Sequence, residues 1–336
     1  VPTPVIGGVA MLAGIAVATL CAVQAIDASI VGFLCAGAVL VVVGLLDDKF
    51  DIDWKLRILA QVVAALLMIY VGGVRVDYLG EIFGMDHKNL GRVSVPFTVF
   101  ATVGIINAVN MVDGADGLAG LLVGAALVML GAAAVYSGNH LVFARTTIVL
   151  GAVSAFLLYN IRHPWQHRAR CFMGNAGSAM LGLTIAWITV QLTQNPAHPV
   201  TPVLALWLVP IPLMDCLVLM LRRLKLGHSP FRADRNHIHH LMFECGFTPT
   251  ITALALAAFS AVCGLCAGLV LRADVSHNYL LGGFFVLCIA WYWMTSRRGR
   301  ALAFFGGVRS AGKPRIKPPA EDDGAGEGAK IFARRQ

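Results

Sequence analysis

Apolar runs long enough to cross a lipid bilayer recur along almost the whole sequence. A helix needs about 20 such residues to span the hydrocarbon core. Because lipid offers no hydrogen-bond partners, backbone groups must be paired within each run, and the runs fold as helices. Ten runs qualify, some short enough to be tilted or broken, at residues 5–25, 30–46, 58–73, 95–109, 118–136, 141–159, 176–192, 203–221, 251–271 and 279–295. The sequence therefore predicts an all-α polytopic integral membrane protein with about ten transmembrane helices.

Composition and charge exclude a soluble protein. Charged residues make up 13% of the chain, against about one quarter in soluble domains. The net charge of +8 would suggest nucleic-acid binding in a soluble protein. Here the basic residues border apolar spans, which indicates membrane topology and no nucleic-acid partner.

The polar loops between the runs are predicted to share one face of the membrane. If each run crosses once, loops 47–57, 110–117, 162–175, 222–250 and the tail from 296 lie together. Even without the ten Lys and Arg residues of that tail, 11 lie on this face against five on the other. Lys and Arg gather on the cytoplasmic side, so this face is predicted to be cytoplasmic.

The most polar of the apolar stretches is IINAVNMVDGADGLAG, residues 105–120. Asn107, Asn110, Asp113 and Asp116 follow one another at spacings of three, which places them roughly on one helix face. The glycines among them indicate a helix-loop-helix junction that the carboxylates would line. An ordinary polar loop between two spans is the alternative.

Adjacent carboxylates, Asp47 and Asp48, end the second run with Lys49, Lys55 and Arg57 close by. Adjacent acids repel unless a metal, a proton or a cation intervenes. This pattern indicates divalent-metal or phosphate chemistry, with an ordinary interfacial charge cluster as the alternative.

Small residues begin the seventh run, in RCFMGNAGSAMLG, residues 170–182. Gly174, Asn175, Gly177 and Ser178 would leave backbone N–H groups free to bind an anion at a helix N-terminus. Simple helix packing is the alternative.

Arginines and histidines fill RRLKLGHSPFRADRNHIHHLMFECG, residues 222–246. The His-x-His-His pattern could ligate zinc, but Cys245 is the only thiol nearby. Phosphate recognition by Arg222 and Arg223, with a histidine orienting or donating a proton, fits the surroundings better. A merely basic membrane-surface loop remains the alternative. Together, the four stretches describe a site for phosphate groups and for Mg²⁺ or Mn²⁺, which prefer oxygen ligands.

Four motifs, in order, carry a family resemblance: DDKFD at 47–51, NAVNMVDGADGLAG at 107–120, FMGNAGS at 172–178 and SPFRADRNHIHH at 229–240. They resemble those of the polyprenyl-phosphate N-acetylhexosamine-1-phosphate transferases. The HIHH form resembles the WecA-like branch, UDP-GlcNAc:undecaprenyl-phosphate GlcNAc-1-phosphate transferase, more than the peptidoglycan branch. Family members have eleven spans, so we expect one more to precede Val1.

The resemblance implies a multi-pass enzyme of the bacterial inner membrane that works at the cytoplasmic face. It would transfer sugar 1-phosphate from a UDP-N-acetylhexosamine to undecaprenyl phosphate and release UMP. GlcNAc is the leading sugar, with FucNAc and QuiNAc as alternatives, and a homodimer is compatible with this interpretation. The implied catalytic residues are Asp47, Asp48, Asp113, Asp116 and His237; substrate-binding residues are Asn107, Asn110, Lys55, Arg222, Arg223, His239 and His240; Asn110 and Asn175 would bind Mg²⁺ or Mn²⁺.

Position 175 departs from the family pattern, which has an aspartate implicated in metal binding where this chain has Asn175. Asparagine keeps an oxygen ligand but lacks the negative charge. We therefore expect weak metal affinity and low activity.

Two other classes of protein remain as hypotheses. An ion-coupled transporter also keeps carboxylates in its spans, although its site tends to lie near the midplane between repeated halves. A catalytically silent scaffold would be compatible with Asn175. Residues 1–299 are predicted to form the transferase domain, and 300–336, rich in Gly, Pro, Lys and acidic residues, a disordered cytoplasmic tail.

Overall fold

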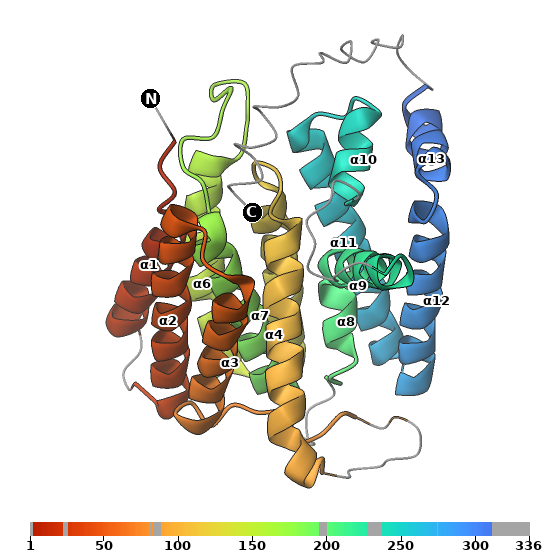
Figure 1. The fold of residues 1–336 in the computed structure, drawn as a ribbon. Coiled ribbons are helices and arrows are strands. Elements are labelled where there is room, and N and C mark those ends of the chain that lie inside the picture. The colour runs from red at the N-terminus through yellow and green to blue at the C-terminus, as the bar shows by residue number, and fades with distance from the viewer. Residues whose placement is uncertain are drawn as a thin grey trace.

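The fold was analysed in a computed structural model that describes residues 3–22, 26–80, 82, 89–194, 200–227, 237–273 and 275–310. In these ranges the chain is helical with no β-strand, which confirms the predicted all-α fold class (Figure 1). The helices are α1 (Gly7–Ala22), α2 (Ala28–Phe50), α3 (Trp54–Tyr70), α4 (Ser94–Val112), α5 (Leu118–Tyr136), α6 (His140–Asn160), α7 (Gly174–Thr193), α8 (Leu204–Leu208), α9 (Pro210–Lys225), α10 (Ile238–Glu244), α11 (Pro249–Arg272), α12 (His277–Thr295) and α13 (Arg298–Ser310), with a 3₁₀ turn at Gly91–Val93.

Each predicted apolar run lies in helical structure, and 7 helices in the described ranges are long and apolar enough to cross a membrane. One run is broken, because residues 203–221 form α8 and α9 instead of a single helix. Pro210 lacks a backbone N–H, and Val209 before it adopts a non-helical φ of −124° and ψ of 48°. A proline disfavours the helical conformation in the residue that precedes it, so the chain changes direction there, and α9 crosses its neighbours steeply in Figure 1.

Helix α7 forms the centre of the bundle and is buried along almost its whole length. Small residues allow the neighbouring helices to approach it closely. A Cβ on Gly44 of α2 would lie 2.3 Å from the Ala176 Cα atom, and one on Gly182 would lie 2.5 Å from the Ile106 Cα atom of α4. Close backbone contacts of this kind hold helices together in a bilayer, where apolar burial alone distinguishes little between protein and lipid.

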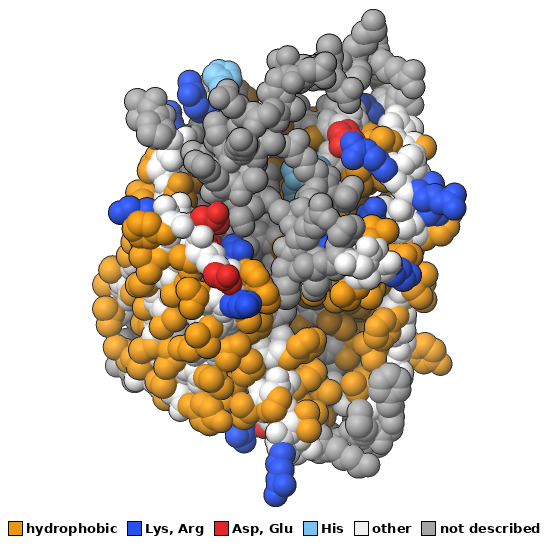
Figure 2. All heavy atoms as spheres, viewed as in Figure 1, with side chains coloured by type: hydrophobic (Ala, Val, Ile, Leu, Met, Phe, Trp, Pro, Cys, Tyr) orange, Lys and Arg blue, Asp and Glu red, His pale blue; other side chains and the backbone are white. Residues whose placement is uncertain are grey.

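The described motif residues lie at the ends of α2 and α4 and at the starts of α7 and α10, which are all at one end of the bundle, the upper end in Figure 1. On the face seen in Figure 2, apolar side chains cover much of the lower half, while most of the visible charged side chains lie in the upper half and a few basic ones lie at the lower edge. The described parts of the four motifs therefore lie at the same end of the bundle.

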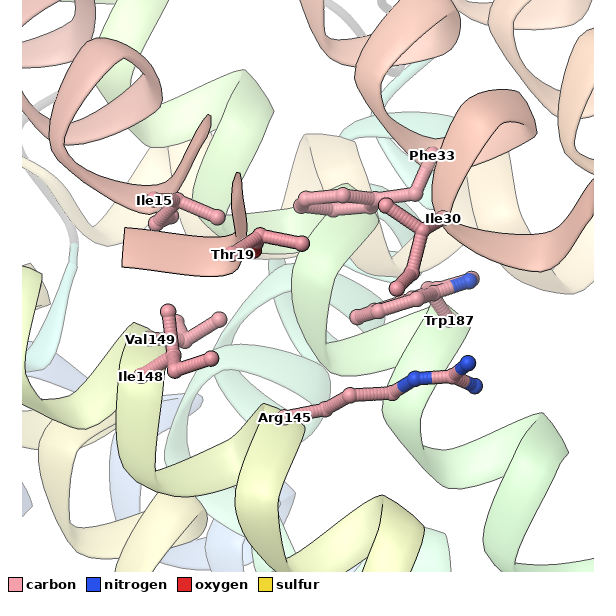
Figure 3. A pocket seen from close by; sticks show the side chains of 8 residues that line it. All are labelled: Ile15, Thr19, Ile30, Phe33, Arg145, Ile148, Val149 and Trp187. Carbon is pink, nitrogen blue, oxygen red and sulfur yellow. The ribbon is translucent and has the colours of Figure 1, made fainter. Parts of the chain in front are cut away.

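A small apolar pocket lies toward the opposite end, between α1, α2, α6 and α7 (Figure 3). Arg145 of α6 is 5% exposed and is bonded to Asp27 and Gln191. Its guanidinium carbon also lies 5.4 Å from the ring centroid of Trp187, which stacks on Phe33. These contacts tie α6 and α7 to the start of α2.

The C-terminal region departs from expectation at its beginning. Residues 298–310 form α13, so the predicted disordered tail does not begin at residue 300. Ala301 and Phe305 of this helix are buried. The composition of residues 300–336 as a whole gave no indication of this burial. Residues 311–336 lie outside the described part of the chain.

Candidate active site

The end of α2 brings two carboxylates to the upper end of the bundle. Asp47 is 5% exposed and lies 3.2 Å from the Arg57 guanidinium, while its other oxygen accepts a hydrogen bond from the Ile52 N–H at 3.1 Å. The helix ends at Asp51, whose φ of 50° turns the chain back toward α3. Arg57 of α3 is thereby placed to neutralise a buried acid.

The start of α7 meets this acidic pair. Asn175 donates from its backbone N–H to Asp48 at 3.0 Å and from its side-chain Nδ2 to Asp47 at 2.8 Å. Gly174 before it has a φ of +70°, and a Cβ there would lie 2.3 Å from an Asp48 oxygen. Only glycine fits both the backbone conformation and the close carboxylate. Two motifs separated by 127 residues therefore form one site.

The end of α4 adds Asn110 but directs Asn107 elsewhere. Asn110 donates to Asn175 Oδ1 at 3.0 Å and to Ser178 Oγ at 2.8 Å. Asn107 instead exchanges hydrogen bonds with Gln61 of α3, the shorter at 2.6 Å. A step of three residues turns a helix about 60° short of a full turn, so the two asparagines face different helices. The predicted substrate-binding role of Asn107 has no support from these contacts.

The loop between α4 and α5 supplies two further acids. Asp116 pairs with Arg162, with 2.6 Å between oxygen and nitrogen. Burial, followed by the charges of Asp48 and Asp116, raises the pKa of Asp113 to about 7. Carboxylates from two separate motifs are therefore close enough to perturb one another.

The histidine segment, residues 237–240, reaches the same loop at the start of α10. A Cβ on Gly114 would lie 2.4 Å from His239 Nε2, so glycine makes room for the imidazole. Burial and the neighbouring His240 and His237 lower the pKa of His239 well below its usual value. Both His239 ring nitrogens lack a partner in the described part of the chain. A neutral, buried imidazole with unused hydrogen-bonding capacity therefore faces the acidic loop.

A residue that the sequence analysis did not single out, Asp215 of α9, is 2% exposed and lies 2.8 Å from His237 Nδ1. The signal that could have found it is simple: it is the only acid inside the apolar run 203–221. An ionisable residue in such a run is a functional candidate by default.

The remaining predicted residues lie around this centre. Arg222 donates to the Thr295 carbonyl at 3.1 Å, and Arg223 is 5% exposed. Lys55 is exposed at the start of α3, with its ammonium 5.9 Å from the Trp54 ring centroid. Residues 228–236, which include the whole SPFRADRN segment, lie outside the described ranges.

The donor set fits a hard divalent cation better than zinc. No three His, Cys, Asp or Glu side chains in the described ranges are grouped so that they could hold a metal ion. Zinc takes its whole coordination from such groups in structural sites, whereas Mg²⁺ keeps several waters and binds one or two carboxylates plus substrate phosphates. The negative charges of Asp48 and Asp116, which contribute to the raised pKa of Asp113, would be neutralised in part by such a cation.

These features define a polytopic membrane protein with a cluster of carboxylate, amide and imidazole side chains at one end of a helix bundle. The family described as "Glycosyl transferase family 4" matches residues 30–193, the stretch that contains Asp47, Asn110 and Asn175.

The similar proteins include several named undecaprenyl-phosphate alpha-N-acetylglucosaminyl 1-phosphate transferase. That of Yersinia pestis is 36% identical over 302 residues, covering 90% of this chain and 82% of the relative. That of Escherichia coli strain K12 is 35% identical over 305 residues, with the same two shares of 90% and 82%. That of Haemophilus influenzae is 36% identical over 249 residues, covering 74% and 70%. The chain belongs to glycosyl transferase family 4, and it is a membrane-embedded transferase.

Proposed function

We propose that this transferase moves N-acetylhexosamine 1-phosphate, with GlcNAc as the leading sugar, from a UDP-sugar to undecaprenyl phosphate and releases UMP. The names of the relatives support the acceptor and the transferred group. The observation that carries the proposal is the convergence of Asp47, Asp48, Asn110 and Asn175, from three distant motifs, within hydrogen-bond distance. Such a centre can hold a diphosphate and the cation that accompanies it.

The chain's own residues bind and orient the phosphates. A lipid phosphate is already anionic, so the difficulty is to bring it against a diphosphate and to bear the charge of the transition state. A strong base is unnecessary. Arg57 and Arg162, each paired with an acid at the site, hold positive charge beside it.

A bound Mg²⁺ or Mn²⁺, held by Asp48 and Asp113 with amide oxygens of Asn110 and Asn175, would neutralise phosphate charge and polarise the transferred group. Asp47 then serves to position Asn175, since the Asn175 amide donates to it at 2.8 Å. Arg57 lies 3.2 Å from Asp47 and places a positive charge beside this acceptor.

The place of the site at the end of the bundle suits its two substrates. A polyprenyl tail can remain in hydrocarbon beside the apolar surface, while the UDP-sugar arrives from water (Figure 2). The excess of Lys and Arg in the motif loops supports a cytoplasmic location for this end.

The test is a panel of radiolabelled UDP-sugars offered with short-chain undecaprenyl-type phosphate to the purified chain and to its Asn175→Asp variant. We expect release of UMP and labelling of the lipid with UDP-GlcNAc above UDP-FucNAc and UDP-QuiNAc. Because Asn175 lacks the family's negative charge, the parent chain should be slower than the variant. No lipid product from either form with any sugar would refute the proposed reaction.

A further inference from the structure

A buried acid outside the four motifs, Asp215, holds the histidine segment in place. Asp215 lies in α9 among apolar neighbours such as Ile211, Met214 and Val218, all of them buried. Burying a carboxylate costs free energy unless it is paired and hydrogen-bonded. An apolar side chain of similar size would fill this position without that cost, so packing does not explain the acid.

Both oxygens of Asp215 are used, and both contacts are with the start of the histidine segment. Oδ2 lies 2.8 Å from His237 Nδ1, and Oδ1 accepts a hydrogen bond from the Ile238 backbone N–H at 3.3 Å. A carboxylate can only accept hydrogen bonds, so the proton between Asp215 and His237 resides on Nδ1. This arrangement selects the tautomer of His237 and directs its other nitrogen, Nε2, away from α9.

His237 is connected to the loop between α4 and α5 through His239. Its ring stacks on that of His239, with 5.6 Å between centroids, and His239 in turn fits against Gly114. The side chain of His237 is 10% exposed, whereas that of Asp215 is 4% exposed. Of the two, the histidine is the group placed to meet a ligand.

We propose that Asp215 is a positioning residue for the transfer reaction: it acts through His237, whose tautomer and ring orientation it sets toward the phosphates of the sugar nucleotide. This inference rests on the proposed function and on the catalytic role that the family resemblance implies for His237. Removal of a group that orients a metal-ligating histidine typically lowers metal affinity or activity about 10- to 100-fold, and we expect an effect of the same order for His237.

The test is a double-mutant cycle with Asp215→Asn, His237→Ala and the combined variant, assayed by UMP release with UDP-GlcNAc and short-chain polyprenyl phosphate. We expect Asp215→Asn to lower kcat by about 10- to 100-fold, with a smaller effect on KM. In the His237→Ala background the same substitution should cause little further loss, because the group through which Asp215 acts is already absent.

A matched acid at the other end of the bundle provides the control. Asp77 accepts a hydrogen bond from Ser94 Oγ at 2.7 Å and pairs with Arg75. Asp77→Asn makes the same chemical change away from the site and should leave kcat and KM unchanged. Melting temperatures of all variants separate loss of folding from loss of positioning.

Equal losses from Asp215→Asn in both backgrounds would show a general structural role and overturn the proposal, as would an unchanged kcat. If Asp215→Asn does not fold, Asp215→Glu takes its place in the cycle, since it keeps the charge but displaces the oxygens. A parent chain without any transfer counts against the proposed function instead. The cycle is then measured as UDP-GlcNAc affinity, where non-additive losses support the positioning role and additive losses overturn it.

Discussion

Replacing Asn175 by aspartate should lower the stability of the metal-free protein and raise its affinity for Mg²⁺. In the structure the Asn175 amide donates to Asp47 at 2.8 Å, and its oxygen accepts from Asn110 at 3.0 Å. An aspartate keeps the acceptor toward Asn110 but turns the donor toward Asp47 into a second negative charge. The backbone hydrogen bond from residue 175 to Asp48 remains.

The magnitude follows from these contacts. A hydrogen bond to a charged acceptor contributes about 1.5–3 kcal/mol. Two like charges about 4 Å apart repel by about 4 kcal/mol at the effective dielectric near a protein surface. Arg57 beside Asp47 and water at the half-buried position 175 offset part of this. We expect Asn175→Asp to destabilise the metal-free protein by about 2–4 kcal/mol.

In Mg²⁺ the difference in stability between variant and parent should change sign, because the added carboxylate is an oxygen ligand that carries a charge. A ligand at 100 times its Kd stabilises the folded state by about 2.7 kcal/mol. The variant should therefore melt below the parent in EDTA and gain more from each increment of Mg²⁺. Its kcat should rise over the same Mg²⁺ range.

The assay is thermal unfolding in detergent across an Mg²⁺ titration, with UMP release measured in parallel. Asn139→Asp is the matched control, since Asn139 caps α6 through the Val142 N–H at 3.1 Å and aspartate caps a helix equally well. It adds the same charge at the end of the bundle away from the site and should change neither metal dependence nor rate. Equal metal-free melting and equal Mg²⁺ dependence of Asn175→Asp and the parent would refute the reasoning.

Three further predictions follow from the site and its surroundings. Because the pKa of Asp113 is raised to about 7, Mg²⁺ affinity measured by calorimetry should increase from pH 6 to pH 8 as this carboxyl ionises. Asp113→Asn should flatten that pH profile. The metal-free protein should lose stability as the pH rises from about 4 to 7, since the folded state retains a proton that the unfolded state releases. Gly44→Ala should lower the melting temperature and the rate, since its Cβ would lie 2.3 Å from the α7 backbone, whereas Gly124→Ala, with open space around it, should do neither; equal melting of the two would contradict the packing argument. The combined Asn107→Leu and Gln61→Leu variant should keep KM for UDP-GlcNAc, because these two amides bond one another, and a large rise in KM would restore Asn107 to the binding site.

Part of the candidate site could be predicted from the sequence, because the motifs that carry its residues are local. Asp47, Asp48, Asn110 and Asn175 each stand out as polar groups at the end of an apolar run. Their mutual contacts were not legible, since Asn110 reaches Asn175 across 65 residues and Asn175 reaches Asp47 across 128. The break at Pro210 had a local signal in its proline, but the direction that α9 takes after it depends on packing.

Hydropathy alone predicted an all-α membrane protein with its motif-bearing loops on one side, because an apolar run of about 20 residues can pair its backbone groups in lipid as a helix and the order of the runs sets the topology. Only the tertiary structure decided which polar groups meet. Asn107 turns to Gln61, and Asp215 turns to His237. Such pairings depend on helix rotation and on close contacts at small residues, which vary by fractions of a turn and of an ångström. No pattern in a single chain specifies geometry at that scale.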